Sequence, residues 1–283
     1  MRVVDSHMHL IDITAHDWYP GLSAWAESLQ KPGLYRDFSL EAYRAAAGGL
    51  TVDTFVHVSA TTKPGAHLAE AAWLDEVAEA HDLDLAVIGT VDPAGSPDEI
   101  RAELESQAAS PRFRGVRVLY GFDPDSPAAD TVLGWLDERG LVFDLVINPD
   151  AMAAWLRRLE RFPGLTVVLE HTGWPSSVDA TGRAEWQEAV RTFASATSAP
   201  CKLSGLGMAT LDVSEGSLRP WLEFAVDQLG WDRVMFGSNM PIETMGGSFE
   251  QLLTTLRAVV GEASAADQAR FWGENAVAAY RLG

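Results

Sequence analysis

Histidine side chains follow two short apolar runs that lie far apart in the chain. His7 and His9 come at the end of the run that begins at Val3, and His171 follows the run Thr166–Leu169. Residues two apart on an extended backbone point to the same side, so His7 and His9 face one way. An imidazole can accept a proton, donate a hydrogen bond or bind a metal ion. The three histidines therefore predict an active site that uses acid–base or metal chemistry.

An amide stands at the end of another apolar run, in the segment Phe236–Pro241, which reads FGSNMP. A carboxylate at such a place can accept a proton from water, whereas the carboxamide of Asn239 only donates or accepts hydrogen bonds. Asn239 is therefore expected to act by hydrogen bonding. The proton that an attacking water molecule loses must then be accepted by a histidine or by Glu243, which lies four residues further on.

Short apolar runs and amphipathic stretches alternate along the chain. The runs are apolar on both faces, as strands buried in a parallel sheet are. The predicted strands are Val3–Ser6, Thr54–Val58, Leu85–Thr90, Gly115–Leu119, Val142–Ile147, Thr166–Leu169, Cys201–Ser204 and Arg233–Phe236. The predicted helices are Leu40–Ala47, Ala66–His81, Pro97–Ser110, Ala128–Arg139, Asp150–Phe162, Arg183–Ser198, Pro220–Leu229 and Phe249–Val260.

This alternation predicts an α/β fold, a (β/α)8 or TIM barrel. An open doubly wound sheet is the alternative, but no G-x-G-x-x-G follows the first strand. The 283 residues fit one barrel domain spanning residues 1–283. Two parts exceed a minimal barrel. Ile11–Arg36 forms an extended first βα loop that is rich in aromatic residues, and Ala263–Leu282 predicts one or two extra C-terminal helices.

Polar residues at strand C-terminal ends line the active site of a β/α barrel. The expected catalytic residues are His7, His9, Arg117, His171 and Asn239. The expected substrate-binding residues are Trp18, His57, Ser59, Asp92, Tyr120, Trp174 and Glu243. Three of these assignments have a structural alternative: His57 as a core histidine, Arg117 as an ion-pair partner of Asp144 or Asp92, and Trp174 as wall packing.

Two mechanisms remain open for these residues. His7, His9 and His171 can hold one Zn²⁺ with an open fourth position, and the ion would polarise a carbonyl group and activate water. The same histidines can also work without a metal, with one of them or Glu243 as the base and Arg117 and Asn239 stabilising an oxyanion. The sequence thus predicts either no cofactor or one divalent metal such as zinc.

The composition of the chain excludes several classes of partner and of structural feature. The formal net charge of −19 repels phosphate backbones, so nucleic acid is not expected to bind. The single cysteine, Cys201, excludes an internal disulfide and begins an apolar run, which favours a buried thiol. No run of about 20 apolar residues indicates a membrane span. We expect a cytoplasmic protein with a small-molecule substrate; whether copies assemble into a homo-oligomer stays open.

Several motifs together resemble the amidohydrolase superfamily. They are Asp5–Leu10 (DSHMHL), Arg114–Arg117 (RGVR), His171–Pro175 (HTGWP), Lys202–Leu206 (KLSGL) and Phe236–Pro241 (FGSNMP). Within the superfamily they are similar to the branch of sugar lactonases, which is related to 2-pyrone-4,6-dicarboxylate lactonase. The likeness runs nearly end to end and includes the segment Trp272–Ala276.

The resemblance implies a TIM-type barrel whose site histidines are His7, His9 and His171. It also implies that Arg117 matches an arginine that helps to bind a substrate carboxylate in the dicarboxylate lactonase. In most relatives an aspartate at the position of Asn239 ligates metal, acts as general acid/base, or does both. This departure favours the metal-free mechanism.

The expected activity is therefore that of a hydrolase that opens the ring of a small polar lactone, such as a sugar acid lactone. Related superfamily members decarboxylate aromatic or unsaturated acids, but they use a metal and the aspartate that is absent here. A third alternative is a ligand-binding barrel or a repurposed, non-hydrolytic biosynthetic enzyme. The three retained histidines argue against a pure binder, which needs no cluster of titratable imidazoles.

Overall fold

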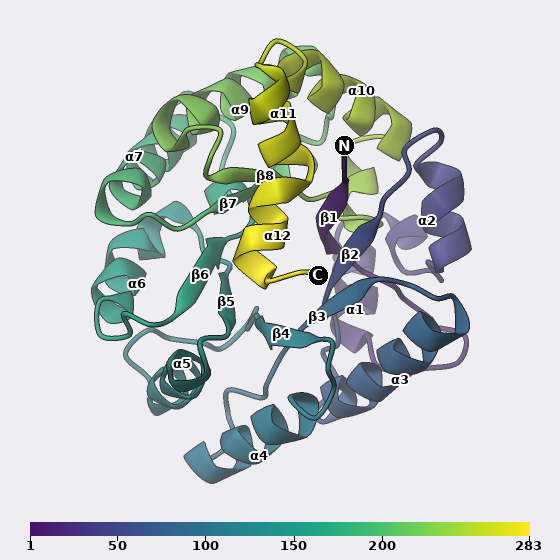
Figure 1. Cartoon of the computed structure of the whole chain (residues 1–283), viewed down its shortest axis with the longest axis vertical. Helices are drawn as coiled ribbons and strands as arrows, with labels where there is room; N and C mark the ends of the chain where they lie inside the picture. Colours follow the sequence, from purple (N-terminus) through teal and green to yellow (C-terminus); the bar gives the residue numbers. More distant parts are fainter.

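Eight parallel strands form the centre of the molecule, in the order β1 to β8 along one sheet (Figure 1). The computed structural model describes residues 1–283. The strands are β1 Val4–Met8, β2 Thr54–Val58, β3 Leu85–Gly89, β4 Phe113–Val116, β5 Val142–Leu145, β6 Thr166–Leu169, β7 Cys201–Leu203 and β8 Val234–Phe236. The predicted (β/α)8 architecture is confirmed, and each predicted strand is present. The bounds of β2 and β6 are as predicted, and those of the other six strands differ by one to three residues at one or both ends.

Helices surround the sheet and connect successive strands. The α-helices are α1 Pro20–Ser28, α2 Leu40–Ala46, α3 Ala66–Ala80, α4 Pro97–Gln107, α5 Pro127–Arg139, α6 Met152–Leu159, α7 Ala180–Ala196, α8 Leu206–Thr210, α9 Glu215–Leu229, α10 Phe249–Val260, α11 Ala265–Ala269 and α12 Asn275–Tyr280. Short helical turns are η1 Pro32–Leu34, η2 Pro149–Ala151, η3 His171–Gly173 and η4 Ile242–Met245, and a π-helical segment, η5, spans Arg270–Glu274. The predicted helix start at Pro220 is wrong, because α9 begins five residues earlier and keeps this proline inside.

The barrel closes between β1 and the segment that follows β8. The His9 amide donates to the Met240 carbonyl at 2.8 Å, and the Asn239 amide donates to the His7 carbonyl at 2.7 Å. Nearer the start of β1, Ser6 Oγ donates to the Phe236 carbonyl at 2.6 Å. These bonds join the two ends of the sheet at the place where two of the predicted site segments meet.

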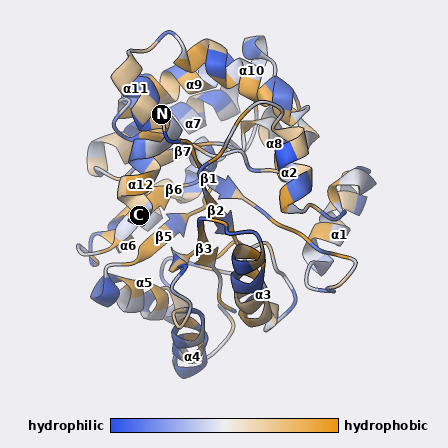
Figure 2. Ribbon diagram, turned by 45° about the vertical axis from the view of Figure 1, so that its right-hand side comes forward, coloured by the Kyte–Doolittle hydropathy of each residue, from blue (hydrophilic) through white to orange (hydrophobic).

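Two hydrophobic clusters lie on the two faces of the sheet. The larger cluster fills the space between strands and helices, and the smaller one lies inside the barrel, where Val56, Val142 and Val168 meet α12. Helix α12 crosses the barrel axis and closes the end at which the strands begin (Figure 1). The helices carry apolar residues toward the sheet and polar residues outward (Figure 2). Side chains of the strands therefore alternate between a helix-packed layer and a barrel interior.

The long first βα loop carries structure of its own. It contains α1 and η1, and α1 lies at the end of the barrel opposite to α12 (Figure 2). The Gly21 amide donates to Thr62 Oγ1 at 2.7 Å, which ties α1 to the loop after β2. The ends of the connection are joined by a bridge between Ile11 and Phe38. This arrangement places α1 over the mouth of the barrel.

None of the helices combines the length with the hydrophobicity that crossing a lipid bilayer would require.

Gly115 in β4 provides a test of the strand packing. A Cβ atom at this position would lie 1.8 Å from the carbonyl oxygen of Val142 in the paired strand β5. We expect Gly115→Ala to lower the free energy of unfolding by roughly 3 kcal/mol or more, because the backbone of either strand must move. Urea denaturation measures this loss. Gly134→Ala in α5 is the matched control, since its Cβ would meet only ordinary contacts; equal stability of the two variants would contradict the packing described here.

Candidate active site

A cavity of about 360 Å³ opens at the C-terminal ends of the strands. Four of the predicted catalytic residues, His9, Arg117, His171 and Asn239, line it. The walls are largely apolar, with Leu22 and Trp25 from α1, Leu119, Trp174, Met208 and Ile242 among the lining residues. The cavity therefore combines titratable groups with apolar faces against which a ring can pack.

His9 has one fixed nitrogen and one free nitrogen. Its Nδ1 lies 2.6 Å from the carbonyl oxygen of Val58, which can only accept, so Nδ1 carries the hydrogen and donates it. The remaining nitrogen, Nε2, is then an acceptor, and no protein group hydrogen-bonds to it. A neutral imidazole with an unshared Nε2 lone pair thus faces the cavity.

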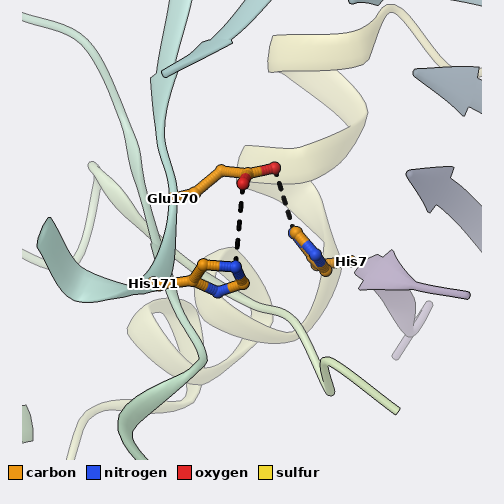
Figure 3. A group of neighbouring side chains, drawn as sticks. All are labelled: His7, Glu170 and His171. Atoms are coloured by element: carbon orange, nitrogen blue, oxygen red, sulfur yellow. Dashed lines mark ion pairs between the residues drawn. The ribbon is translucent and has the colours of Figure 1, made fainter. Parts of the chain in front are cut away.

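The other two histidines lie on either side of a carboxylate (Figure 3). Glu170 Oε1 is 3.2 Å from His7 Nδ1, and Glu170 Oε2 is 3.7 Å from His171 Nε2. The Nδ1 of His171 is 3.1 Å from Ser204 Oγ. His7 is fully buried, and its Nε2 has no hydrogen-bond partner. Glu170 thus lies close to both imidazoles, while the hydrogen bond of His171 is made with Ser204.

Two cations neutralise this carboxylate. Lys202 Nζ, from β7, lies 3.5 Å from Glu170 Oε1 and 3.2 Å from His7 Nδ1. Arg117 Nη1 lies 3.5 Å from Glu170 Oε2. Burial by itself raises the pKa of the Glu170 carboxyl, but its neighbours His7, Arg117 and Lys202 hold that pKa well below its usual range. Glu170 is therefore ionised at neutral pH.

Arg117 does not form the ion pair that the sequence suggested for it. Its partners are Glu170 and the carbonyl oxygen of Ser59, which accepts from Nη2 at 2.5 Å. Asp144 pairs instead with Lys202, at 2.5 Å. Arg117 also lines the cavity, so the guanidinium is held by the protein on one side and faces the cavity on the other.

Burial keeps the site imidazoles neutral. It lowers the pKa of His9 to about 3, with Arg117 as the next cause, and the pKa of His171 to about 4. The pKa of His7 is held well below its usual value by the same loss of hydration. At neutral pH these side chains therefore offer lone pairs and N–H groups rather than positive charge.

The chain after β6 adopts an unusual backbone path. His171, Thr172, Gly173 and Trp174 all have positive φ values, of 53°, 55°, 75° and 30°. This conformation is costly for residues with a Cβ and persists only where the surroundings enforce it. Here the indole of Trp186 donates to the Thr172 carbonyl at 2.7 Å. The turn presents His171 and Trp174 to the cavity.

The side chain of Asn239 is held in place by Glu243. Its Nδ2 donates to Glu243 Oε2 at 3.1 Å, and Glu243 Oε1 accepts from the Gly207 amide at 2.6 Å. The amide nitrogen of Asn239 thus points to Glu243, and its amide oxygen is left for the cavity. Asn239 has a φ of 52°, a conformation that asparagine tolerates better than most residues.

The structure separates the predicted substrate-binding residues into groups. Tyr120 and Trp174 line the main cavity. Ser59 and Asp92 line a neighbouring cavity of about 170 Å³ that shares Arg117 and Tyr120 with it. His57 and Glu243 are buried and line neither cavity.

Trp18 likewise lines neither cavity. It stacks on His16, with ring centroids 3.7 Å apart, and packs against Trp73. Trp25, further along the same loop, occupies the wall instead.

Three side chains that line the cavity or contact the site histidines were not identified from the sequence. Glu170 directly precedes His171, and Lys202 is a charged residue inside a short apolar run. Both are fully buried. A charged residue inside a short apolar run is a signal that could have identified Lys202, whereas Glu170 lies just after β6 and offers no such signal. Trp25 could not have been separated from Trp18 without the path of the long loop.

One group of donor side chains lies close enough together to be considered as ligands of a single divalent metal. Ligand atoms of His7, Glu170 and His171 lie within 4.8 Å of one another, and His9 is not part of this group. However, the ammonium of Lys202 and the guanidinium of Arg117 each contact an oxygen of Glu170. A divalent cation would meet two positive charges and a carboxylate that they have already neutralised. The residues present do not fit a resident divalent metal.

The chain is similar to known proteins over its whole length. It is 28% identical to the protein y4mH of Sinorhizobium fredii over 303 residues, which cover 100% of this chain and 99% of that one. It is 28% identical to an L-fucono-1,5-lactonase of Burkholderia ambifaria over 256 residues, 87% of this chain and 82% of the relative.

A solved structure has the same fold. It is an amidohydrolase from Burkholderia multivorans with bound zinc, which has a TM-score of 0.84, 24% sequence identity and full coverage of both chains.

A sequence model of the amidohydrolase family matches residues 4–282, nearly the entire chain. The barrel and the histidines at its mouth agree with that match. The chain belongs to the amidohydrolase family and is an enzyme of the amidohydrolase superfamily.

Proposed function

We propose that the enzyme hydrolyses the ring ester of a small polar lactone of the sugar-acid type. The observation that carries this proposal is the joint exposure of a bare imidazole nitrogen, His9 Nε2, and a cation, Arg117, in one cavity. The similarity to L-fucono-1,5-lactonases of Burkholderia ambifaria and Burkholderia multivorans supports a lactone as the substrate class. The cavity volume of about 360 Å³ suits one sugar ring.

In this reaction His9 transfers the proton and Arg117 stabilises the developing negative charge. Water adds to the lactone carbonyl, and His9 Nε2 accepts the proton that the water loses. Because burial and Arg117 lower the pKa of His9 to about 3, the imidazole holds this proton only briefly and is a strong acid when it returns it. The carbonyl oxygen becomes negatively charged and is stabilised by the guanidinium of Arg117. When the ring C–O bond breaks, the proton on His9 passes to the leaving alkoxide, so that the products are a carboxylic acid and a hydroxyl group on one open chain.

The surrounding residues orient the ring. The amide oxygen of Asn239 can accept a hydrogen bond from a substrate hydroxyl, but it cannot take a proton from the attacking water. Trp25 and Trp174 supply aromatic faces in the wall. Such faces pack against the C–H groups of a sugar ring, while the polar groups at the floor distinguish its hydroxyls.

A panel of lactones tests the activity. We expect hydrolysis of at least one five- or six-membered sugar acid lactone, seen as acidification of a weakly buffered solution containing a pH indicator. Spontaneous hydrolysis without enzyme is the baseline. The absence of acidification above this baseline with every lactone, or release of carbon dioxide from an aromatic acid, would argue for a different activity.

Removal of the imidazole of His9 tests its role. We expect His9→Gln to lower kcat by about 10²–10⁴-fold, because the amide forms hydrogen bonds but cannot take up the proton. KM should change much less, since the wall and Arg117 remain. His81→Gln is the matched control, because His81 lies at the end of α3 beside Glu41 and far from the cavity in the fold. A loss confined to KM would contradict the assignment of His9 as the base.

Glu243 is not suited to the role of base that the sequence left open for it. It does not line the cavity, and both of its oxygens already accept hydrogen bonds. Burial raises the pKa of Glu243 to about 7, opposed by its bonds to Asn239 and to the backbone of Gly207 and Gly205. We therefore assign Glu243 the positioning of Asn239.

The raised pKa has a consequence for stability. The folded protein binds the proton of Glu243 more tightly than the unfolded chain does, so this contribution to stability is present below about pH 4.5 and is lost as the pH rises through about 7. The loss is on the order of 3 kcal/mol. Glu243→Gln removes it, and its free energy of unfolding should depend less on pH between these values. Glu70, whose burial raises its pKa to about 7, gives a similar slope that Glu70→Gln removes.

Urea denaturation between pH 4.5 and pH 8 measures these slopes. A pH dependence in Glu243→Gln as steep as that of the wild type would contradict the raised pKa.

A further inference from the structure

We propose that Lys202 is a built-in cation that takes the electrostatic place of a divalent metal at the His7–Glu170–His171 group. Any role of this cation in catalysis rests on the proposed lactone hydrolysis. The test of the proposal measures metal binding, so the proposal stands or falls independently of whether the substrate is a lactone.

The first support is the position of the ammonium. Lys202 Nζ lies 3.2 Å from His7 Nδ1 and 3.5 Å from Glu170 Oε1, so it contacts two of the three residues whose ligand atoms cluster in the barrel. The side chain is fully buried and therefore has no hydration shell to compensate its charge. Its charge is directed entirely at this group and at Asp144.

The second support is that the ammonium is anchored. Asp144 Oδ2 binds Nζ at 2.5 Å, and Tyr280 of α12 donates its hydroxyl to Asp144 Oδ1 at 2.8 Å. Nζ also lies 5.4 Å from the centre of the Tyr280 ring. Strand alternation directs Lys202 into the barrel, because its neighbours Cys201 and Leu203 pack in the layer between sheet and helices. The cation cannot swing away to solvent.

The third support is the charge balance. The buried cluster contains two cations, Lys202 and Arg117, and two carboxylates, Glu170 and Asp144, and it sums to zero with neutral imidazoles. Adding a divalent ion would leave a buried excess of two positive charges. Removing the Lys202 ammonium would leave one uncompensated negative charge beside three potential ligands, which favours a divalent ion.

Zinc binding to the full-length protein tests the proposal. Wild type, Lys202→Met and Lys202→Arg are stripped with a chelator, exposed to zinc chloride and dialysed, and the bound zinc is measured by mass spectrometry. Thermal unfolding is followed with and without zinc. We expect no retained zinc in the wild type, and one zinc ion per chain in Lys202→Met, with affinity increased roughly 100-fold or more because a unit charge beside the ion is gone. Lys202→Arg, which keeps the charge, should behave like the wild type.

Two further variants locate the site. In Lys202→Met/His171→Gln the gain should disappear, because a ligand is lost, whereas zinc held on surface groups would remain. In Lys202→Met/Asp144→Asn the gain should be smaller, because the negative charge that draws the ion is removed as well.

Two results would overturn the proposal. One is stoichiometric zinc in the wild type that His171→Gln abolishes. The other is a Lys202→Met protein that gains neither zinc nor thermal stability from it. If Lys202→Met folds only when zinc is present, the proposal is supported, and if it stays unfolded even with zinc, the proposal fails.

Discussion

The structure depends on a neutral cluster of charged side chains buried in the centre of the barrel. Arg117, Asp144, Glu170 and Lys202 come from or directly follow four successive strands, and each would be strongly destabilising without its partners. Because each strand contributes one charge, the relative positions of the strands are constrained by the need to pair them. The cluster lies above the valine layer of the barrel interior, and Tyr280 connects it to the helix that closes the opposite end.

The same cluster determines the state of the imidazoles. Its charges cancel, so no net negative charge remains to hold a proton on His7 or His171, and burial keeps both neutral. The tautomer of His7 depends on which neighbour its Nδ1 engages. If Nδ1 accepts from Lys202, Nε2 carries the hydrogen; if Nδ1 donates to Glu170, Nε2 is bare. His9 has no such choice, because Val58 offers only a carbonyl oxygen, and this fixed tautomer is what suits it to accept a proton.

The sequence predicted the barrel and the residues at its mouth, since apolar runs and the histidines that follow them are local signals. It named Arg117 and Asp144, but it did not predict the buried charges of Glu170 and Lys202. Lys202 sits in a strand of only three residues, and nothing local shows that its side chain points into the barrel rather than outward. Glu170 directly precedes His171, which was identified, but a carboxylate next to a histidine indicates no function until its partners from other strands are known. Trp18 and Trp25 could be distinguished only by the path of the loop, which places Trp18 before α1 and Trp25 within it.

The neighbouring side chain of Glu243 explains why an amide rather than an acid suits position 239. The two side chains are 3.1 Å apart and buried, so a carboxylate at position 239 would face a second carboxylate at hydrogen-bond distance. Two such groups cannot both be ionised without a large cost, and they would have to share a proton. With an amide at position 239 a single carboxylate remains, held by Asn239 and the Gly207 amide. An acid at position 239 would also bring an unbalanced negative charge to the cavity edge. With the amide, the carboxyl group of Glu243 keeps two hydrogen-bond donors and has no second carboxyl group beside it, and in the proposed mechanism the neutral imidazole of His9 accepts the proton.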